Sequence, residues 1–424
     1  MGPLARLRER FAGTLWFVPS VMVVGAVALA LVTTLLDDLT EGQPFTRFVF
    51  TGGTESSRAI LQTVANAVIT FTALVFTITI VALQLSSQQF SPRVLRTFLR
   101  DRQSQFALGT FIATFIYCLM VLRVITVGNN DGISIPSISM MVLLVLVLAS
   151  VAMFVSYISH MAHSIRVSHI VAAVGDETRA LIDRLPEADP AAAKNRQLFE
   201  QPVVHEIISP GPGSLNAVDH NGLVQLAQSK GLAFEMKRSV GDFVATGQTV
   251  VDVRGGEIDG EVVLSHLSFG LERSMQQDLG FGLRQLVDVA EKGLSPSLND
   301  PTTAVMAIDQ IHDILRRLAK KPFPETEHTD DEAIVRLIAS PLQWEALIDL
   351  AFAEIRQFSG SSLQVTRRIL AALQDLTEIA LPERKEVLRR EERLLKDLIA
   401  KSFDAEEDRR TAGQPDQQGI GSET

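Results

Sequence analysis

Four long apolar stretches constrain this chain of 424 residues more than any other feature. They cover approximately residues 15–36, 59–85, 105–127 and 137–163. Each can cross a hydrocarbon core about 30 Å thick, which takes about 20 helical residues. The first stretch follows three arginines, as a signal peptide would, but its apolar run is too long and no small-residue cleavage site precedes Asp37. We therefore predict a domain of four transmembrane helices at residues 1–166.

The arginines in the short connecting segments predict the orientation of these helices. The basic residues cluster in the N-terminal segment and in the loop between spans two and three: Arg6, Arg8 and Arg10, then Arg93, Arg96, Arg100 and Arg102. The other two loops are mainly acidic. Because short cytoplasmic loops carry an excess of arginine and lysine, both termini are predicted to be cytoplasmic. The basic loop could contact either anionic lipid or the soluble part of the chain.

Charge also separates the two halves of the chain. Residues 1–166 hold 11 of the 39 basic residues and 7 of the 49 acidic ones, a net charge of +4, which leaves 28 basic and 42 acidic residues, or −14, for 167–424. An acidic soluble half argues against nucleic acid as the main partner. The single cysteine, Cys118, lies in an apolar run, so neither a disulfide framework nor a cysteine zinc site is expected. We expect no cofactor and no metal.

Span two differs from the others because it is rich in amide and hydroxyl side chains. Five of them fall within roughly 80° of one another on a helix: Gln62, Asn66, Thr70, Thr77 and Gln84. Polar groups in hydrocarbon need partners, so this stripe should not face lipid. Two interpretations remain open. The stripe forms interhelical hydrogen bonds, or it lines a water-filled path around the axis of an oligomer.

The soluble half reads as an α+β region with distinct parts. We expect a helical linker at 167–200, a β-rich subdomain at 201–270, a helical subdomain at 271–403 and a disordered tail at 404–424. VVHEIIS is a strand candidate, and NGLVQLAQSKG predicts a short helix that ends at Gly231. The following stretch, with Gly241, Asp242 and Gly247, resembles the first half of biotinyl and lipoyl carrier folds. This resemblance implies a small β-sandwich without a prosthetic group, because Lys237 precedes the Gly-Asp turn.

The helical subdomain contains the clearest candidate for a polar site. Asp300-Pro301 predicts a helix start, with Asp as the capping residue and Pro in the first turn. Three further amphipathic helices are expected near 342–358, 361–379 and 383–401. The candidate polar residues are Arg273, Arg284, Asp288, Asn299 and Asp300. They could hold an anion at a helix N-terminus, or they could be caps and ion pairs that brace a helical hairpin.

Two motifs resemble a known family. They are SSQQFSPRVLRTFLRDRQSQFALGTFIATFIYCLMVLR and GFGLRQLVDVAEKGLSPSLNDPTTA. With the four-span layout, they are similar to a widespread family of predicted bacterial membrane proteins of unknown function. One departure lies at PGPGSLNAVD, where members read roughly Ser-Gly-Tyr. The resemblance covers nearly the whole chain except the tail and implies the bacterial cytoplasmic membrane, but it implies no activity.

Three functions are compatible with the sequence. The first is a homo-oligomeric channel or transport protein, lined by span two and regulated by a cytoplasmic domain. The second is a membrane-anchored structural or adaptor protein that binds cytoplasmic protein partners through its amphipathic helices. The third is an enzyme that uses the polar residues around Arg284, but no phosphate loop, paired-histidine motif or nucleophile elbow supports it.

Overall fold

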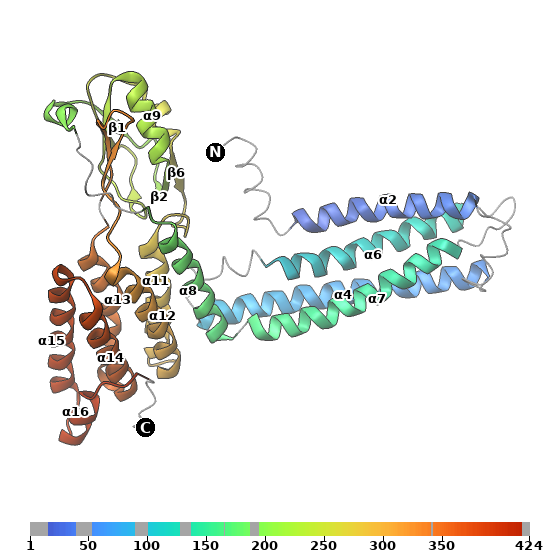
Figure 1. Cartoon of the computed structure of the whole chain (residues 1–424). Coiled ribbons are helices and arrows are strands. Elements are labelled where there is room, and N and C mark those ends of the chain that lie inside the picture. Colours follow the sequence, from blue (N-terminus) through green and yellow to red (C-terminus); the bar gives the residue numbers. More distant parts are fainter. Residues whose placement is uncertain are drawn as a thin grey trace. The chain divides into compact units, whose positions relative to one another are not determined.

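A computed structural model describes residues 16–39, 53–89, 101–127, 137–164, 166–186, 195–340 and 342–417. Contacts within the chain divide it into two compact units, Met1–His169 and Ile170–Thr424. The first contains four helices that are long and apolar enough to cross a membrane, and the second combines helices with two small sheets (Figure 1). The sequence-based fold class is therefore confirmed.

The membrane unit is built around its third long helix. Its four helices are α2 (Phe17–Leu39), α4 (Thr54–Gln89), α6 (Arg102–Val127) and α7 (Ser137–Ser164). Helix α6 contacts each of the other three. In its most apolar stretch 44% of the residues are buried, against 17–22% in the others, so α6 is the central helix. Small residues permit close packing here, because a Cβ on Gly109 of α6 would lie 2.5 Å from Sδ of Met22 in α2.

The two tyrosines of the chain join these helices by hydrogen bonds. The hydroxyl of Tyr117 lies 3.0 Å from Oγ1 of Thr33 in α2 and donates to the carbonyl of Ser139 in α7. The hydroxyl of Tyr157 in α7 lies 2.6 Å from Oγ1 of Thr79 in α4. Both tyrosines are fully buried. A buried hydroxyl in an apolar bundle needs a partner, so these bonds specify which helix faces meet.

Two aspartates, Asp37 and Asp101, accept hydrogen bonds from the first turns of membrane helices. Asp37, near the end of α2, accepts hydrogen bonds from the backbone N–H and the hydroxyl of Ser139, at 3.0 and 2.6 Å, in the first turn of α7. Asp101 accepts from the N–H and hydroxyl of Ser104 in the first turn of α6 and lies 3.0 Å from Nε2 of His160 in α7. Each carboxylate thus satisfies free donors of one helix and ties it to a second structural element.

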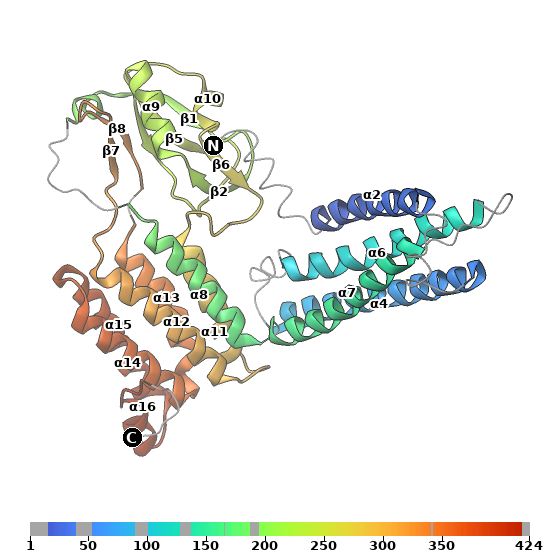
Figure 2. The ribbon, with the colours of Figure 1, turned by 45° about the vertical axis from the view of Figure 1, so that its right-hand side comes forward.

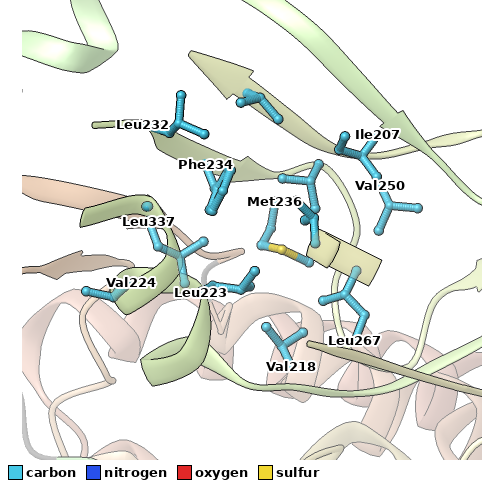
Figure 3. Close-up of a cluster of buried hydrophobic side chains, with 14 of the residues drawn as sticks. Ile207, Val218, Leu223, Val224, Leu232, Phe234, Met236, Val250, Leu267 and Leu337 are labelled. Atoms are coloured by element: carbon cyan, nitrogen blue, oxygen red, sulfur yellow. The ribbon is translucent and has the colours of Figure 1, made fainter. Parts of the chain in front are cut away.

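The C-terminal unit contains two sheets that share one apolar core. The larger sheet has the order β1-β5-β3-β8-β7 and the smaller has the order β4-β2-β6. The strands are β1 (Val203–Ile208), β2 (Gly213–Val218), β3 (Ala233–Met236), β4 (Phe243–Val244), β5 (Thr249–Arg254), β6 (Leu267–Gly270), β7 (Glu327–Thr329) and β8 (Val335–Ile338). Buried residues of both sheets and of α9 (His220–Lys230) pack together (Figure 3). Two sheets around one core match the sandwich-like expectation.

The longer helices of this unit pack side by side, next to the part of the unit that contains the two sheets (Figure 2). They are α8 (Val167–Asp183), α11 (Leu279–Leu294), α12 (Pro301–Lys320), α13 (Trp344–Phe358), α14 (Leu363–Ile379), α15 (Lys385–Ser402) and α16 (Glu406–Ala412), while the short elements η2 (Gln197–Glu200), α10 (Gly260–Leu264), η3 (Ser359–Ser361) and η4 (Pro382–Arg384) lie between the larger ones in the chain. Asp300 caps α12 through the N–H and hydroxyl of Thr303. The expected helix end at Gly231 is also present, with the glycine in the left-handed region at φ 69°.

Helix α8 corrects the expectation of a linker. Arg179 donates to the side chains of Gln310 and Asp313 in α12 at 2.8 and 3.0 Å. A Cβ on Gly282 in α11 would lie only 2.2 Å from Oγ1 of Thr178, so the two helices are in close contact. Its residues from Ile170 onward therefore belong to the core of the C-terminal unit.

Two further parts of the predicted domain organisation were wrong, namely the helical subdomain and the tail. The region 271–403, expected to be helical, also contains the hairpin β7–β8, and β8 pairs in parallel with β3. The tail, expected to be disordered from 404, forms α16, and the backbone N–H of Asp416 donates to the carbonyl of Arg367 in α14. Arg367 Nε in turn donates to the carbonyl of Gln414. Nothing local in the tail sequence announces these contacts, because their partner lies on a distant helix.

The β7–β8 turn depends on one buried carboxylate. Asp330 accepts from the N–H groups of Glu332 and Ile334 and from Nε of Arg336 at 2.7 Å. Burial by itself raises the pKa of Asp330, but the bonds from Arg336 and the two N–H groups outweigh it and hold the pKa below the ordinary 3.8. The contribution to stability is therefore complete above the ordinary pKa and is lost as the pH falls through the lower, folded-state value.

We predict that Asp330→Ala lowers the free energy of unfolding of this unit by about 3 kcal/mol, because it leaves Arg336 buried without its carboxylate. The chain has two tryptophans, exposed Trp16 and buried Trp344. In a Trp16→Phe background, the fluorescence of Trp344 reports unfolding of the C-terminal unit alone. The matched control is Asp331→Ala, whose side chain is exposed. Equal stability of the two variants would contradict this role for Asp330.

Candidate functional site

The polar stripe of span two lies on the outer surface of the membrane unit. Gln62, Asn66, Thr70, Thr77 and Gln84 are all exposed on α4. The opposite face of the helix is buried against the bundle through Leu61, Ala65, Val68, Val75 and Ala82. The stripe is therefore not buried by any other part of the chain that the structure describes. Hydrogen bonds to the other described helices of this chain do not account for it.

The two kinds of side chain in the stripe differ in what they require. Thr70 and Thr77 donate to the carbonyls of Asn66 and Ala73 one turn earlier, at 3.0 and 2.9 Å. A threonine that bonds to its own helix can face lipid. An amide side chain has two N–H donors and one acceptor, which a helix does not satisfy in this way. The demand for an outside partner thus rests on the amides.

Their depth in the membrane shows which of the amide side chains need a hydrogen-bond partner. The apolar part of α4 is Glu55–Leu85, so its midpoint is near Thr70. At 1.5 Å per residue, Asn66 lies about 6 Å and Gln62 about 12 Å from the midpoint, inside a half-core of about 15 Å. Gln84 lies about 21 Å away, beyond the hydrocarbon. Gln62 and Asn66 are therefore the amides that lipid cannot satisfy.

The basic loop can be described only in part. Arg93, Arg96 and Arg100 lie outside the residues that the structure describes. Arg102 is the first residue of α6, and its side chain is exposed. The contacts expected for this loop therefore remain predictions.

The polar residues proposed in the helical subdomain are spread along α11 rather than gathered at one place. Arg273 forms two hydrogen bonds with Asp278, at 2.8 and 3.0 Å, and this aspartate caps the start of α11. Asn299 and Asp300 follow the other end of the helix, which is 16 residues or about 24 Å long. Only Arg284 and Asp288, one turn apart within α11, are brought together, at 2.6 Å.

Arg284 is surrounded by carboxylates. Besides Asp288, its guanidinium binds Glu354 of α13 and Glu291 one further turn along α11, the latter at 3.3 Å. The excess of negative charge makes this place unsuited to an anion, and the ion pairs brace α11 against α13. Burial raises the pKa of Glu291 to about 7, with further contributions from its neighbour Glu354.

This raised pKa predicts a pH dependence of stability. The folded state keeps the proton of Glu291 up to about pH 7, whereas the unfolded chain loses it near its ordinary pKa of 4.5. Stability should therefore fall as the pH rises through this window, by on the order of 1 kcal/mol after solvent screening. Glu291→Gln should flatten the fall, measured by Trp344 fluorescence in the Trp16→Phe background. The control is Glu257→Gln at an exposed site, and an unchanged pH profile in Glu291→Gln would contradict the assignment.

A cavity of about 460 Å³ in the C-terminal unit was not indicated by any sequence motif. The end of α8, the segment after β3, the start of α11 and the segments on either side of β7–β8 line it. Val218 and Met236, which belong to the core in Figure 3, form part of its wall. The cavity joins six segments from distant parts of the sequence, including Val218 and His220 at the end of β2 and the start of α9, so only the folded chain creates it.

Among the residues that the structure describes, no group of three or more histidine, cysteine, aspartate or glutamate residues has an arrangement that could hold a metal ion. Within the described residues, the cavity and the α4 stripe are the candidate functional sites.

Comparison with known proteins agrees with the assignment as a membrane protein. A family model described as predicted membrane protein (DUF2254) matches residues 12–375. The chain belongs to this family. It is 28% identical over 412 residues to the uncharacterized protein Rv1290c of Mycobacterium tuberculosis and to the uncharacterized protein Mb1321c of Mycobacterium bovis. Each alignment covers 94% of this chain and 78% of the relative. No solved structure is significantly similar to the chain.

Proposed function

We propose that this chain is one subunit of a homo-oligomeric membrane channel or transport protein, in which α4 lines a polar path. The observation that carries the proposal is the exposure of Gln62 and Asn66 at hydrocarbon depth on the outer face of the subunit. An amide left unsatisfied in hydrocarbon costs several kcal/mol. Neighbouring copies of the chain with a hydrated path between them provide the partners that lipid cannot.

The remaining exposed surface of the membrane unit supports this assignment. Helix α7 exposes Leu144, Val145, Leu148 and Val155, all of which are suited to lipid. Amide side chains on an exposed face are a feature of α4. The contrast between these two helices favours α4 over α7 as the face that meets other copies.

The orientation follows from the arginine distribution. The basic N-terminal segment and the basic segment between α4 and α6 lie on the cytoplasmic side of a bacterial inner membrane, and the C-terminal unit lies on the same side. Helix α8, most of which belongs to this unit, is separated from α7 by only two residues, since α7 ends at Ser164 and α8 begins at Val167. A domain so placed can regulate the path.

The orientation predicts the behaviour of reporter fusions. Green fluorescent protein fused to the C-terminus should fluoresce, and alkaline phosphatase fused at the same place should be inactive. Alkaline phosphatase fused after Gly53, between the first two spans, should be active. The reverse activities would contradict the cytoplasmic placement of the C-terminal unit.

Ion flux into liposomes tests the path. The variant Gln62→Leu/Asn66→Leu/Thr70→Leu removes the polar groups near the middle of the span and should reduce flux by about tenfold or more, because a dehydrated stretch is a barrier to ions. The control is Leu74→Ile/Val81→Ile/Leu85→Ile, which changes three exposed apolar residues of the same helix without changing polarity. Flux equal in both variants and the wild type would exclude a path along this face.

Disulfide cross-linking separates a path from simple association. In a Cys118→Ala background the chain has no other cysteine. Asn66→Cys should form a disulfide between copies in the membrane, and Leu148→Cys on α7 should not. Cross-linking at position 66 without any flux would favour an oligomeric anchor for cytoplasmic partners instead.

A further inference from the structure

The 460 Å³ cavity in the C-terminal unit has a size that is typical of sites for small ligands. Its wall is mixed. Apolar side chains come mainly from Leu181, Leu185, Leu279, Pro324 and Leu342, and polar ones come from two arginines, two histidines and several amides and hydroxyls. A wall of this composition fits a molecule that has an apolar part and a polar group.

Arg238 is the residue in this wall that most needs a partner. It follows β3, and its Nε is fully buried without any hydrogen bond among the residues that the structure describes. No carboxylate in the described part of the chain forms an ion pair with it. Its neighbour on the chain, Lys237, pairs instead with Glu235 and Asp252 at 3.6 and 3.5 Å. A buried N–H donor without an acceptor is costly. Because Arg238 also lines the cavity, its guanidinium is the group of the wall to which an oxyanion from outside the chain is best suited.

The charges around the cavity favour an anion. Arg184, at the end of α8, is the second arginine of the wall. The two carboxylates of the wall are Asp278 and Glu325, and Asp278 is already held by two bonds from Arg273. Because Arg273 offsets the charge of Asp278, the wall has two positive charges, on Arg184 and Arg238, and one negative charge, on Glu325. His220 adds no charge at neutral pH, because burial lowers its pKa below the ordinary 6.5.

Side chains other than the two arginines hold the wall of the cavity in place. The side-chain amide of Gln277 both accepts from and donates to the backbone of Val218, at 2.9 and 3.2 Å, and so fixes the start of α11 against β2. His220 stacks on His328 with ring centroids 4.6 Å apart. The Gln277 contact joins the sheet part to the helical part beside the cavity, and the histidine stack joins α9 to β7, so the chain's own contacts fix the wall.

We propose that this cavity binds a small organic anion, whose phosphate or carboxylate group is held by Arg238 and Arg184 and whose apolar part lies against the leucine and proline side chains. Guanidinium groups bind such oxyanions through paired hydrogen bonds. Leu279 and Gly280, the first two residues of α11, line the same space. The proposal does not rest on ion conduction and would stand if α4 lined no path.

Phenyl phosphate is a suitable probe because it carries both parts of the ligand. Calorimetry on the full chain in nanodiscs should show binding of phenyl phosphate, with weaker binding of inorganic phosphate, which lacks the apolar part, and of phenol, which lacks the charge. Benzoate in a parallel titration shows which oxyanion is preferred. If neither phenyl phosphate nor benzoate binds at millimolar concentrations, the proposal is overturned.

Variants then assign the role of the arginines. Arg238→Gln should weaken phenyl phosphate binding by about tenfold or more, which corresponds to about 1.4 kcal/mol, and should leave phenol binding unchanged. Arg238→Lys should fall between the two, since it keeps the charge and loses the paired bonds. The control Arg389→Gln, on an exposed part of α15, should bind as the wild type does. Equal binding by Arg238→Gln and wild type would refute the assignment.

Two further arms keep the result decisive. Arg184 is exposed, so Arg184→Gln should fold even if Arg238→Gln does not, and it too should weaken binding. The variant Gln62→Leu/Asn66→Leu/Thr70→Leu should bind the probe as the wild type does. Loss of flux with retained binding in that variant would show that the α4 proposal and the cavity proposal succeed or fail separately.

Discussion

Every polar group within the hydrocarbon must find a partner, and the membrane unit is organised by this requirement. Inside the bundle the buried tyrosines and Asp37 meet this requirement, whereas Nε2 of Gln105, near the start of α6, is buried without a partner among the described residues. Tyr117 joins α6 to α2 and α7, Tyr157 joins α7 to α4, and Asp37 satisfies the first turn of α7. Each contact is worth little on its own, on the order of 0.6 kcal/mol. Their value is specificity, because rotating any one helix would bury these groups without partners.

The same requirement is not met on the outside of α4, and this asymmetry is informative. The buried tyrosine hydroxyls have partners on neighbouring helices, and the threonines of the stripe bond to their own helix. Gln62 and Asn66 have neither solution on an exposed face. A chain that can satisfy its interior polar groups this well would gain stability from leucine at both positions. Their presence therefore supports the proposal that this face of α4 meets a partner beyond the single chain.

Local signals in the sequence predicted local structure well. Apolar length located the four spans, the Asp300-Pro301 pair located the start of α12, and Gly231 located the end of α9. Each depends on residues that are neighbours along the chain. The parallel pairing of β3 with β8, the packing of α8 and the attachment of α16 depend on partners far away in sequence. No periodicity encodes such partners, so these features were missed or assigned to a linker and a tail.

The candidate sites divide in the same way. The α4 stripe could be found from the sequence because helical periodicity places its residues on one face. Arg284 could be singled out, but its partner Glu354 comes from α13, and only the fold reveals that the site is rich in carboxylates. The cavity could not be predicted because Arg184 and Arg238 lie on segments that are far apart in the sequence.

The position of the cavity along the chain also has a mechanical consequence. Leu181 and Arg184 belong to the helix and turn that follow α7 most closely in the chain, so a ligand held there acts on the first element beyond the membrane helices. A ligand can shift a conformational equilibrium only through contacts that differ between states, and α8 is where such contacts would have the shortest covalent route to α7.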